Sequence, residues 1–139
     1  MIQFPDVNVL VALVWEAHMH HSLARRWFAS LEGDEWGSCP VTQAGFVRVS
    51  ANPMVTADAV TVRQATAVLA ELTRRGDHRF LADEVAYVDN PLVPHEALVG
   101  FRQVTDAHLI GLARHHDATL ITLDSGMSNL GGDSVRLLR

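Results

Sequence analysis

Two stretches decide the fold, and they read Val104-Thr105-Asp106-Ala107-His108-Leu109 and Leu120-Ile121-Thr122-Leu123-Asp124-Ser125-Gly126. In the first, Thr105 is a natural helix N-cap, and Asp106 falls in the first turn, where the helix dipole favours negative charge. The second is typical of a short buried strand that ends on an aspartate and is followed by Ser-Gly turn residues. A helix followed by a buried strand is a pattern of α/β proteins.

A third aspartate follows a short apolar start, in Phe4-Pro5-Asp6-Val7-Asn8. In an open α/β sheet, ligands collect outside the carboxyl ends of the parallel strands. A carboxylate at a strand end and another at a neighbouring helix N-terminus therefore share one crevice. Each aspartate alone is an ordinary turn or cap residue, but the set of Asp6, Asp106 and Asp124 suggests a metal site.

The pattern of the whole chain predicts an α/β sandwich with a central, mainly parallel sheet of four to five strands flanked by helices. Strands are expected at 1–4, 36–41, 85–88, 120–124 and 135–138. Helices are expected within 7–15, at 21–32, 43–50 and 57–75, and from Asp106 onward, with Asn8 and Thr42 as N-caps. No repeat, low-complexity tract or linker interrupts the pattern, so one domain is expected.

Composition narrows the classes of function. The formal net charge of −5 argues against a general nucleic-acid binder, but not against a nuclease whose acidic residues bind metal. All 11 basic residues are arginine, which excludes a catalytic lysine and leaves the better bidentate partner for phosphate. Cys39 is alone, so no internal disulfide forms and a cytoplasmic setting fits. No apolar run reaches the length of a membrane span.

Four stretches carry a resemblance to a known family: Pro5–Leu13, Cys39–Arg48, Val104–Leu109 and Leu120–Asp124. Together they resemble PIN-domain ribonucleases, and within them the VapC-type toxins of bacterial toxin–antitoxin pairs. Their order and spacing cover nearly the whole chain, which implies a single PIN-like domain over residues 1–139 with a three-layer sandwich. The segment His18–His21 is similar to the form common among mycobacterial and related actinobacterial members.

The resemblance implies a metal-dependent endoribonuclease that hydrolyses RNA phosphodiester bonds and leaves 5′-phosphate and 3′-hydroxyl ends. Asp6, Asp106 and Asp124 would then be the catalytic residues and hold Mg²⁺ or Mn²⁺, which are cations that prefer oxygen ligands. A bound cation would lower the pKa of a coordinated water and orient the phosphate. The resemblance also implies a homodimer and a VapB-type antitoxin whose tail covers the active site.

One residue departs from the family pattern, because many members have a glutamate where this chain has Gln43. An amide brings no charge and cannot act as a base. The site would hold three negative charges where many relatives have four, which leaves open whether one or two metal ions bind. The residues expected to support the ligands are Asn8, Gln43, Thr105 and Ser125, and the candidate RNA contacts are Arg48, Arg102 and His108.

Two other classes of function remain open. One is a PIN-like module that binds RNA or protein and cuts weakly or not at all; Gln43 favours it, and the three aspartates oppose it. The other is a haloacid-dehalogenase-like phosphatase with Asp6 as nucleophile. That chemistry needs an acid two residues further on, where Asn8 stands, and a lysine, which the chain lacks.

The histidines form two groups in the sequence: His18, His20 and His21, and the adjacent pair His115 and His116. Neighbouring residues of a helix point in different directions, and no His-Glu-x-x-His spacing occurs. These histidines are therefore expected to be solvated rather than to bind zinc.

Overall fold

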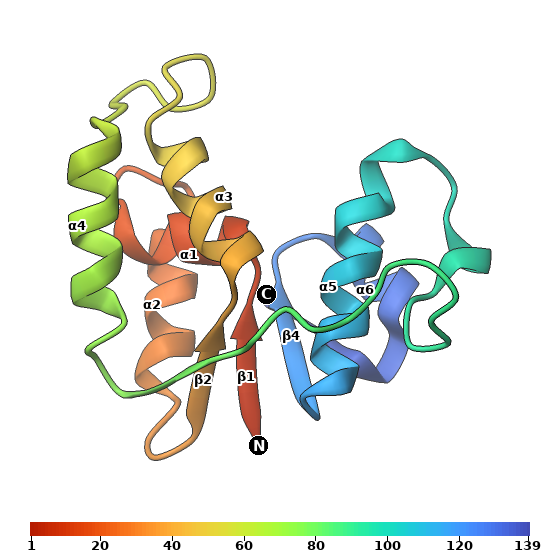
Figure 1. The fold of residues 1–139 in the computed structure, drawn as a ribbon. Helices are drawn as coiled ribbons and strands as arrows, with labels where there is room; N and C mark the ends of the chain where they lie inside the picture. The colour runs from red at the N-terminus through yellow and green to blue at the C-terminus, as the bar shows by residue number, and fades with distance from the viewer.

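Five short strands form one parallel sheet in the computed structural model, which describes residues 1–139 (Figure 1). The strands are β1 (Ile2–Pro5), β2 (Glu35–Ser38), β3 (Asp77–Phe80), β4 (Ala118–Thr122) and β5 (Val135–Leu137). Their order across the sheet is β3-β2-β1-β4-β5, and every neighbouring pair is parallel. The expected α/β class and strand number are confirmed.

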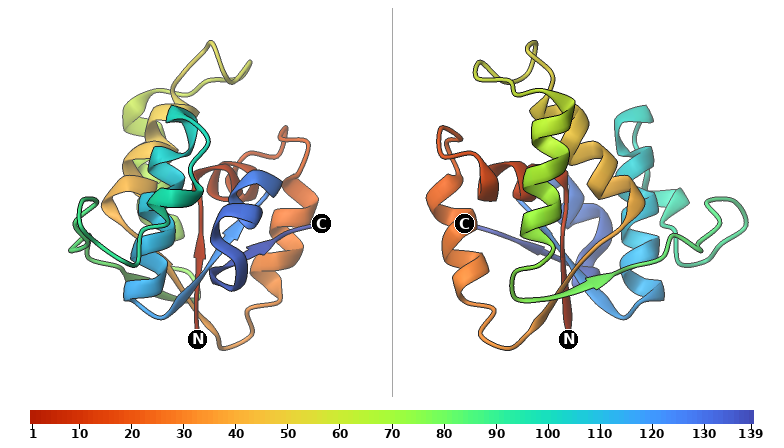
Figure 2. Two further views of the ribbon diagram at one scale, coloured as in Figure 1. Left: turned by 90° about the vertical axis from the view of Figure 1, so that its right-hand side faces the viewer. Right: turned by 60° about the vertical axis from the view of Figure 1, so that its left-hand side comes forward.

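Helices cover both faces of the sheet (Figure 1 and Figure 2). The α-helices are α1 (Val7–Val14), α2 (His21–Ala29), α3 (Pro40–Ser50), α4 (Val62–Leu72), α5 (Val104–His115) and α6 (Ser125–Gly131). Three short 3₁₀ helices are η1 (His95–Ala97), η2 (Phe101–Gln103) and η3 (Gly132–Ser134). The longest helix has 12 residues, and none combines the length and apolar character that crossing a membrane requires.

Two separate cores, one on each face of the sheet, create the three layers. Because successive strand side chains point to opposite faces, Leu120 packs with α5 and α6, whereas its neighbour Ile121 packs with α1 and α4. Phe4 belongs to the first core and Trp36 to the second, and all four side chains are fully buried. The three-layer arrangement is therefore built into the alternation of apolar residues along the strands.

The strand order places a topological switch point between β1 and β4. From β1 the chain winds outward through β2 and β3, and then the 81–103 connection crosses to the other face, where α5 leads into β4 (Figure 1). At such a point the connections leave the two central strands in opposite directions and open a crevice at their carboxyl ends. Asp6 follows β1 directly, and Asp124 lies two residues beyond the end of β4.

The strand predicted at 85–88 is wrong, because the third strand is β3 at Asp77–Phe80. Its sequence, Asp-His-Arg-Phe, is mostly exposed and shows no apolar alternation. It forms because it lies at the sheet edge and pairs with all four residues of β2. Val85 is buried by packing in the core beside α5, not by strand pairing.

Four of the predicted helix starts are displaced. Asp6, not Asn8, caps α1, and Cys39, not Thr42, is the N-cap of α3, where Pro40 takes the first helical position. Thr105 lies inside α5, whose N-cap is Gln103 without a side-chain hydrogen bond. The helix predicted at 57–75 is shorter, because a Thr61–Gln64 capping box starts it at Val62.

Candidate metal centre

Asp6 is held rigidly at the end of β1. Its backbone N–H donates to the Ile121 carbonyl at 2.9 Å, which continues the β1–β4 pairing by one residue. Its carboxylate Oδ1 accepts from the Val9 N–H at 3.0 Å and so caps α1. The residue is only 4% exposed, so this carboxylate has lost most of its hydration.

Thr122 links Asp6 to Asp124. This last residue of β4 is fully buried, and its Oγ1 donates to Asp6 Oδ2 at 2.6 Å. The same oxygen accepts from the Asp124 N–H at 3.0 Å. The Asp124 carboxylate is exposed, and it caps α6 by accepting from the Gly126 N–H at 2.8 Å. One hydroxyl therefore orients the first carboxylate and fixes the backbone that carries the second.

Asp106 is the third aspartate, and it comes from α5 rather than from a strand end. It lies in the first turn of α5 and is half-buried. Burial, and then the charge of Asp124, raise the pKa of its carboxyl. Asp106 and Asp124 thus interact electrostatically, although 18 residues separate them in the sequence.

The electrostatics of the site favour a bound cation. Burial is the main cause that raises the pKa of Asp6 to about 6. Hydrogen bonds from Thr122 and Val9 act in the opposite direction, and the charges of Asp106 and Asp124 add to the increase. Three carboxylates that repel each other in a crevice form an oxygen-only ligand set, which suits Mg²⁺ or Mn²⁺.

Gln43 lies at the same edge of the sheet. Its Nε2 donates to Ser38 Oγ at 3.0 Å, and Ser38 is the fully buried last residue of β2. Ser38 Oγ is also 2.8 Å from His78 Nε2, and burial lowers the pKa of that imidazole. One amide N–H is thus engaged with the protein, which leaves the amide oxygen and the second N–H of Gln43 as the groups that could face a metal-bound water.

The other expected supporting residues lie at the surface around the aspartates. Asn8 is exposed in the first turn of α1, Ser125 is the first residue of α6, and Thr105 is exposed in the first turn of α5. None of the three caps its helix, so the role of N-cap that the sequence offered for Asn8 and Thr105 falls to other residues. Their neighbours in the sequence include the aspartates, which keeps them candidates for orienting a ligand or a water.

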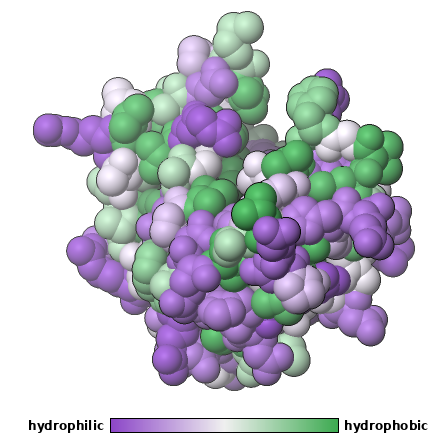
Figure 3. Space-filling model, turned by 45° about the vertical axis from the view of Figure 1, so that its right-hand side comes forward, coloured by the Kyte–Doolittle hydropathy of each residue, from purple (hydrophilic) through white to green (hydrophobic).

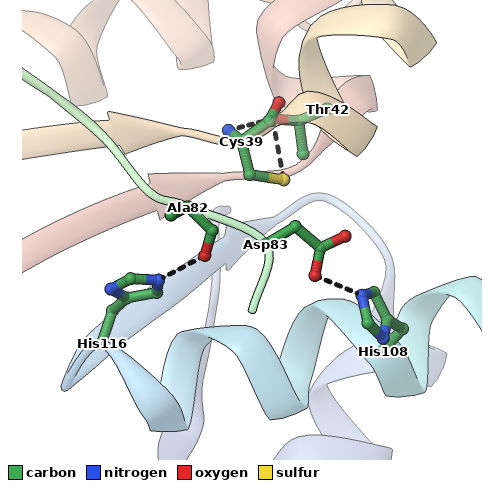
Figure 4. A network of polar contacts seen from close by, with 6 residues as sticks. All are labelled: Cys39, Thr42, Ala82, Asp83, His108 and His116. Carbon is green, nitrogen blue, oxygen red and sulfur yellow. Dashed lines mark hydrogen bonds and ion pairs between the residues drawn. The ribbon is translucent and has the colours of Figure 1, made fainter. Parts of the chain in front are cut away.

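The candidate RNA contacts occupy different positions. His108 is two residues beyond Asp106, and its Nε2 is 2.9 Å from Asp83 Oδ1 (Figure 4). Arg102 lies just before α5, with its guanidinium 5.7 Å from the ring centre of exposed Phe101. Arg48 is exposed in the last turn of α3, about 140° around the helix from Gln43. In the sequence, His108 and Arg102 are therefore nearer to Asp106 than Arg48 is to any of the three aspartates.

Thr122 stands within the predicted strand at 120–124, and nothing in the sequence marks it as part of the site. A threonine inside a β-strand is ordinary, and only the register shows its significance. Pro5 pairs with Ile121, so the next residue on each strand, Asp6 and Thr122, must come together. A predicted pairing of β1 with β4 is the signal that could have revealed it.

A groove of about 480 Å³ lies away from the aspartates. It lies between α1, α2 and α4, with Leu13, Phe28 and Leu72 among its apolar lining residues and Arg25, Glu71 and Arg75 among its charged ones. On the side that Figure 3 shows, hydrophilic residues dominate the lower part, and hydrophobic residues are more frequent toward the top. The candidate centre is thus defined by its chemistry and its place at the switch point, not by cavity size.

We expect Thr122→Val to cost about 1–3 kcal/mol of stability, because it leaves the buried Asp6 oxygen without a donor. It should also raise the pKa of Asp6 further, since the Thr122 hydrogen bond lowers it. Thermal unfolding in chelator measures the loss of stability, and its dependence on pH measures the change in the pKa of Asp6. Thr119→Val, on the same strand, is the matched control, and an equal loss in both variants would contradict the linking role of Thr122.

Comparison with known proteins agrees with this architecture. Residues 4–133 match the PIN domain. The chain is 50% identical over 125 residues to Ribonuclease VapC38 of Mycobacterium tuberculosis (strain ATCC 25618 / H37Rv), which covers 90% of this chain and 86% of that protein. It is 39% identical over 124 residues to Ribonuclease VapC39 of the same strain, covering 89% of each.

A solved structure shows the same fold. It is described as VapBC2 from Rickettsia felis bound to a DNA fragment from their promoter, and it aligns with a TM-score of 0.65 over 100% of both chains at 14% identity. The fold and the match over residues 4–133 define a PIN-domain protein. The chain belongs to this family, and within it to the group of VapC ribonucleases.

Proposed function

We propose that this protein is a metal-dependent endoribonuclease that hydrolyses RNA phosphodiester bonds and is inhibited by a VapB-type antitoxin. The observation that carries the proposal is the electrostatic coupling of three aspartates: the charges of Asp106 and Asp124 help to raise the pKa of Asp6, and that of Asp124 helps to raise the pKa of Asp106. The ribonuclease names of relatives that share up to 50% identity with the chain support RNA as substrate.

In this proposal the three aspartates are the catalytic residues and hold Mg²⁺ or Mn²⁺. When bound, such a cation lowers the pKa of a coordinated water and offsets charge on the phosphate. Thr122 keeps the buried Asp6 carboxylate in one orientation, and the N-caps of α1 and α6 fix Asp6 and Asp124 by backbone donors. Because water rather than the RNA 2′-hydroxyl attacks, the products carry 5′-phosphate and 3′-hydroxyl ends.

Partners follow from the same family. A structure of similar fold is described as VapBC2 with promoter DNA, which supports a VapB-type antitoxin for this chain. A basic side chain of such an antitoxin would be attracted to the cluster of aspartates. The proposal includes a homodimer, one PIN domain over residues 1–139 and a cytoplasmic location, where both RNA and antitoxin are present.

Cleavage of total bacterial RNA by the purified protein tests the function. Discrete cuts that require Mg²⁺ or Mn²⁺, stop with chelator and leave 5′-phosphates are the expected result. Release of phosphate from small phosphate esters instead would identify a phosphatase. RNA bound without cuts, by folded protein shown to be free of antitoxin, would identify the non-cutting module and overturn the proposal.

We expect Gln43→Glu to preserve Mg²⁺ affinity or increase it, because it adds a fourth negative charge at the edge where the aspartates meet. Calorimetric Mg²⁺ titration measures the change. Gln64→Glu, on exposed α4, is the matched control, since Gln64 already accepts from the Thr61 N–H through its side-chain oxygen. A large loss of affinity in Gln43→Glu alone would show that residue 43 does not face the metal.

A further inference from the structure

A second group of metal-ligating side chains lies at the opposite end of α5 from Asp106. His115 is the last residue of this helix, His116 is its C-cap, and Glu84 reaches them from the 81–103 connection. One ligand atom of each residue lies within 4.8 Å of those of the other two. Asp106 is nine residues before His115, which is about 14 Å along an α-helix. The group is therefore separate from the aspartates.

We propose that Glu84, His115 and His116 bind a divalent transition-metal ion of the Zn²⁺ class. Imidazole and carboxylate together are typical ligands of Zn²⁺, whereas Mg²⁺ prefers oxygen ligands alone. This inference does not depend on the ribonuclease activity. It assigns to the chain two cation sites of different ligand chemistry, at the two ends of α5.

The spacing of the first two ligands suits a tetrahedral ion. His115 Nε2 is 3.3 Å from Glu84 Oε1. Two ligand atoms, each about 2.0–2.1 Å from a tetrahedral zinc ion, are about 3.3–3.4 Å apart. Both side chains are well exposed, at 39% and 62%, so they can adjust around an ion without repacking the core.

One ring nitrogen of His116 makes a hydrogen bond of the kind that orients metal-binding histidines. Its Nε2 is 2.8 Å from the Ala82 carbonyl oxygen, and because a carbonyl only accepts, Nε2 carries the proton (Figure 4). In the neutral ring this leaves the lone pair on Nδ1 for a ligand. Ligating histidines commonly donate their other ring N–H to a carbonyl in this way. The same Ala82 carbonyl accepts from the Glu84 N–H at 3.1 Å, which ties two of the ligands to one peptide.

Local charge also favours a cation there. The C-terminus of a helix carries partial negative charge, and both histidines lie at the C-terminus of α5. Among the salt bridges of the chain, Glu84 pairs with His115 and with no arginine. One carboxylate and a helix C-terminus thus face two imidazoles, and a divalent ion completes the group.

A bound ion would link two parts of the chain that lie far apart in the sequence. Glu84 and His115 are 31 residues apart, and the part of the chain from Glu84 to the start of α5 is largely irregular. Existing contacts hold this connection to α5 near the proposed site, among them the bond from Arg114 to the Leu92 carbonyl at 2.9 Å. An ion that binds the folded state alone would add to the stability of this layer.

Zinc titration in the presence of saturating Mg²⁺ tests the inference, because Mg²⁺ keeps the aspartates occupied. For the chelator-treated wild-type chain, we expect one equivalent of Zn²⁺ to bind and to raise the unfolding temperature. Loss of an orienting group alone lowers metal affinity by about 10–100-fold. We therefore expect His115→Ala and Glu84→Gln each to weaken Zn²⁺ binding by more than about 100-fold.

Three controls separate this site from the others. The double variant His18→Ala/His20→Ala removes a different histidine group and should bind Zn²⁺ as the wild type does. Asp6→Asn should also retain this binding, and His115→Ala should keep the Mg²⁺-dependent RNA cleavage of the wild type. Unchanged Zn²⁺ affinity in both His115→Ala and Glu84→Gln, or loss of it in Asp6→Asn, would overturn the inference.

Discussion

Replacing Asp6 by asparagine is expected to reduce metal-dependent RNA cleavage by more than about 100-fold while leaving the protein folded. Loss of an outer-shell group already weakens metal sites by about 10–100-fold, and Asp6 is proposed as a ligand. Asparagine keeps the shape of the side chain and the oxygen that accepts from the Val9 N–H. The Thr122 hydroxyl can rotate to accept from the new amide group, so the buried hydrogen bond survives.

The measurement is the cleavage rate at saturating Mn²⁺, together with circular dichroism to verify folding. Asp77→Asn is the matched control, because Asp77 is an exposed first residue of β3 and lies at the opposite edge of the sheet. It removes the same charge and should cut RNA at the wild-type rate. Cleavage by Asp6→Asn at the rate of this control would remove Asp6 from the catalytic site.

In chelator, Asp6→Asn is expected to be more stable than the wild type at pH 7.5, and the difference should vanish near pH 4. The folded-state pKa of Asp6 is about 6, against 3.8 for the free side chain. Below pH 3.8 both states hold the proton, and the stabilisation of the protonated form is fully present. It is lost as the pH rises through 6, because folding then requires a buried negative charge.

The size of this effect follows from the shift. A change of about two pKa units corresponds to about 3 kcal/mol, or about 10 °C in unfolding temperature for a domain of this size. Burial and Asp124 raise the pKa of Asp106 too, so its contribution has the same sign. The lowered pKa of His78 acts in the opposite direction. The wild type and Asp6→Asn share this effect, so it cancels in the difference between their stabilities.

Unfolding temperatures of both proteins between pH 4 and pH 8 test this expectation, with and without Mg²⁺. Saturating Mg²⁺ should stabilise the wild type more than Asp6→Asn, because the ion compensates the buried charge. A difference that stays constant across the pH range would mean that burial does not raise the pKa of Asp6. That result would remove the electrostatic support for a metal site at Asp6.

The layered fold was predictable because its signals are local. Short apolar strands alternate with amphipathic helices, and each element can be recognised within a window of about ten residues. The strand β3 could not be recognised, since Asp77–Phe80 is exposed and acquires its structure from pairing with β2. Helix starts were displaced for a related reason: several residues near each start can cap, and Asp6 caps α1 instead of Asn8 because the β1–β4 pairing fixes its backbone.

The candidate site likewise has parts that the sequence predicts and parts that only the tertiary structure reveals. The sequence alone determined the α/β class, the family resemblance and the three aspartates, since each stands beside a recognisable strand or helix. Only the tertiary structure decided that Thr122 joins Asp6 to Asp124, and that Glu84 meets His115 and His116. These contacts depend on strand register and on how the 81–103 connection packs along α5. Both are set by burial between residues far apart in the chain, which spacing along a single sequence does not encode.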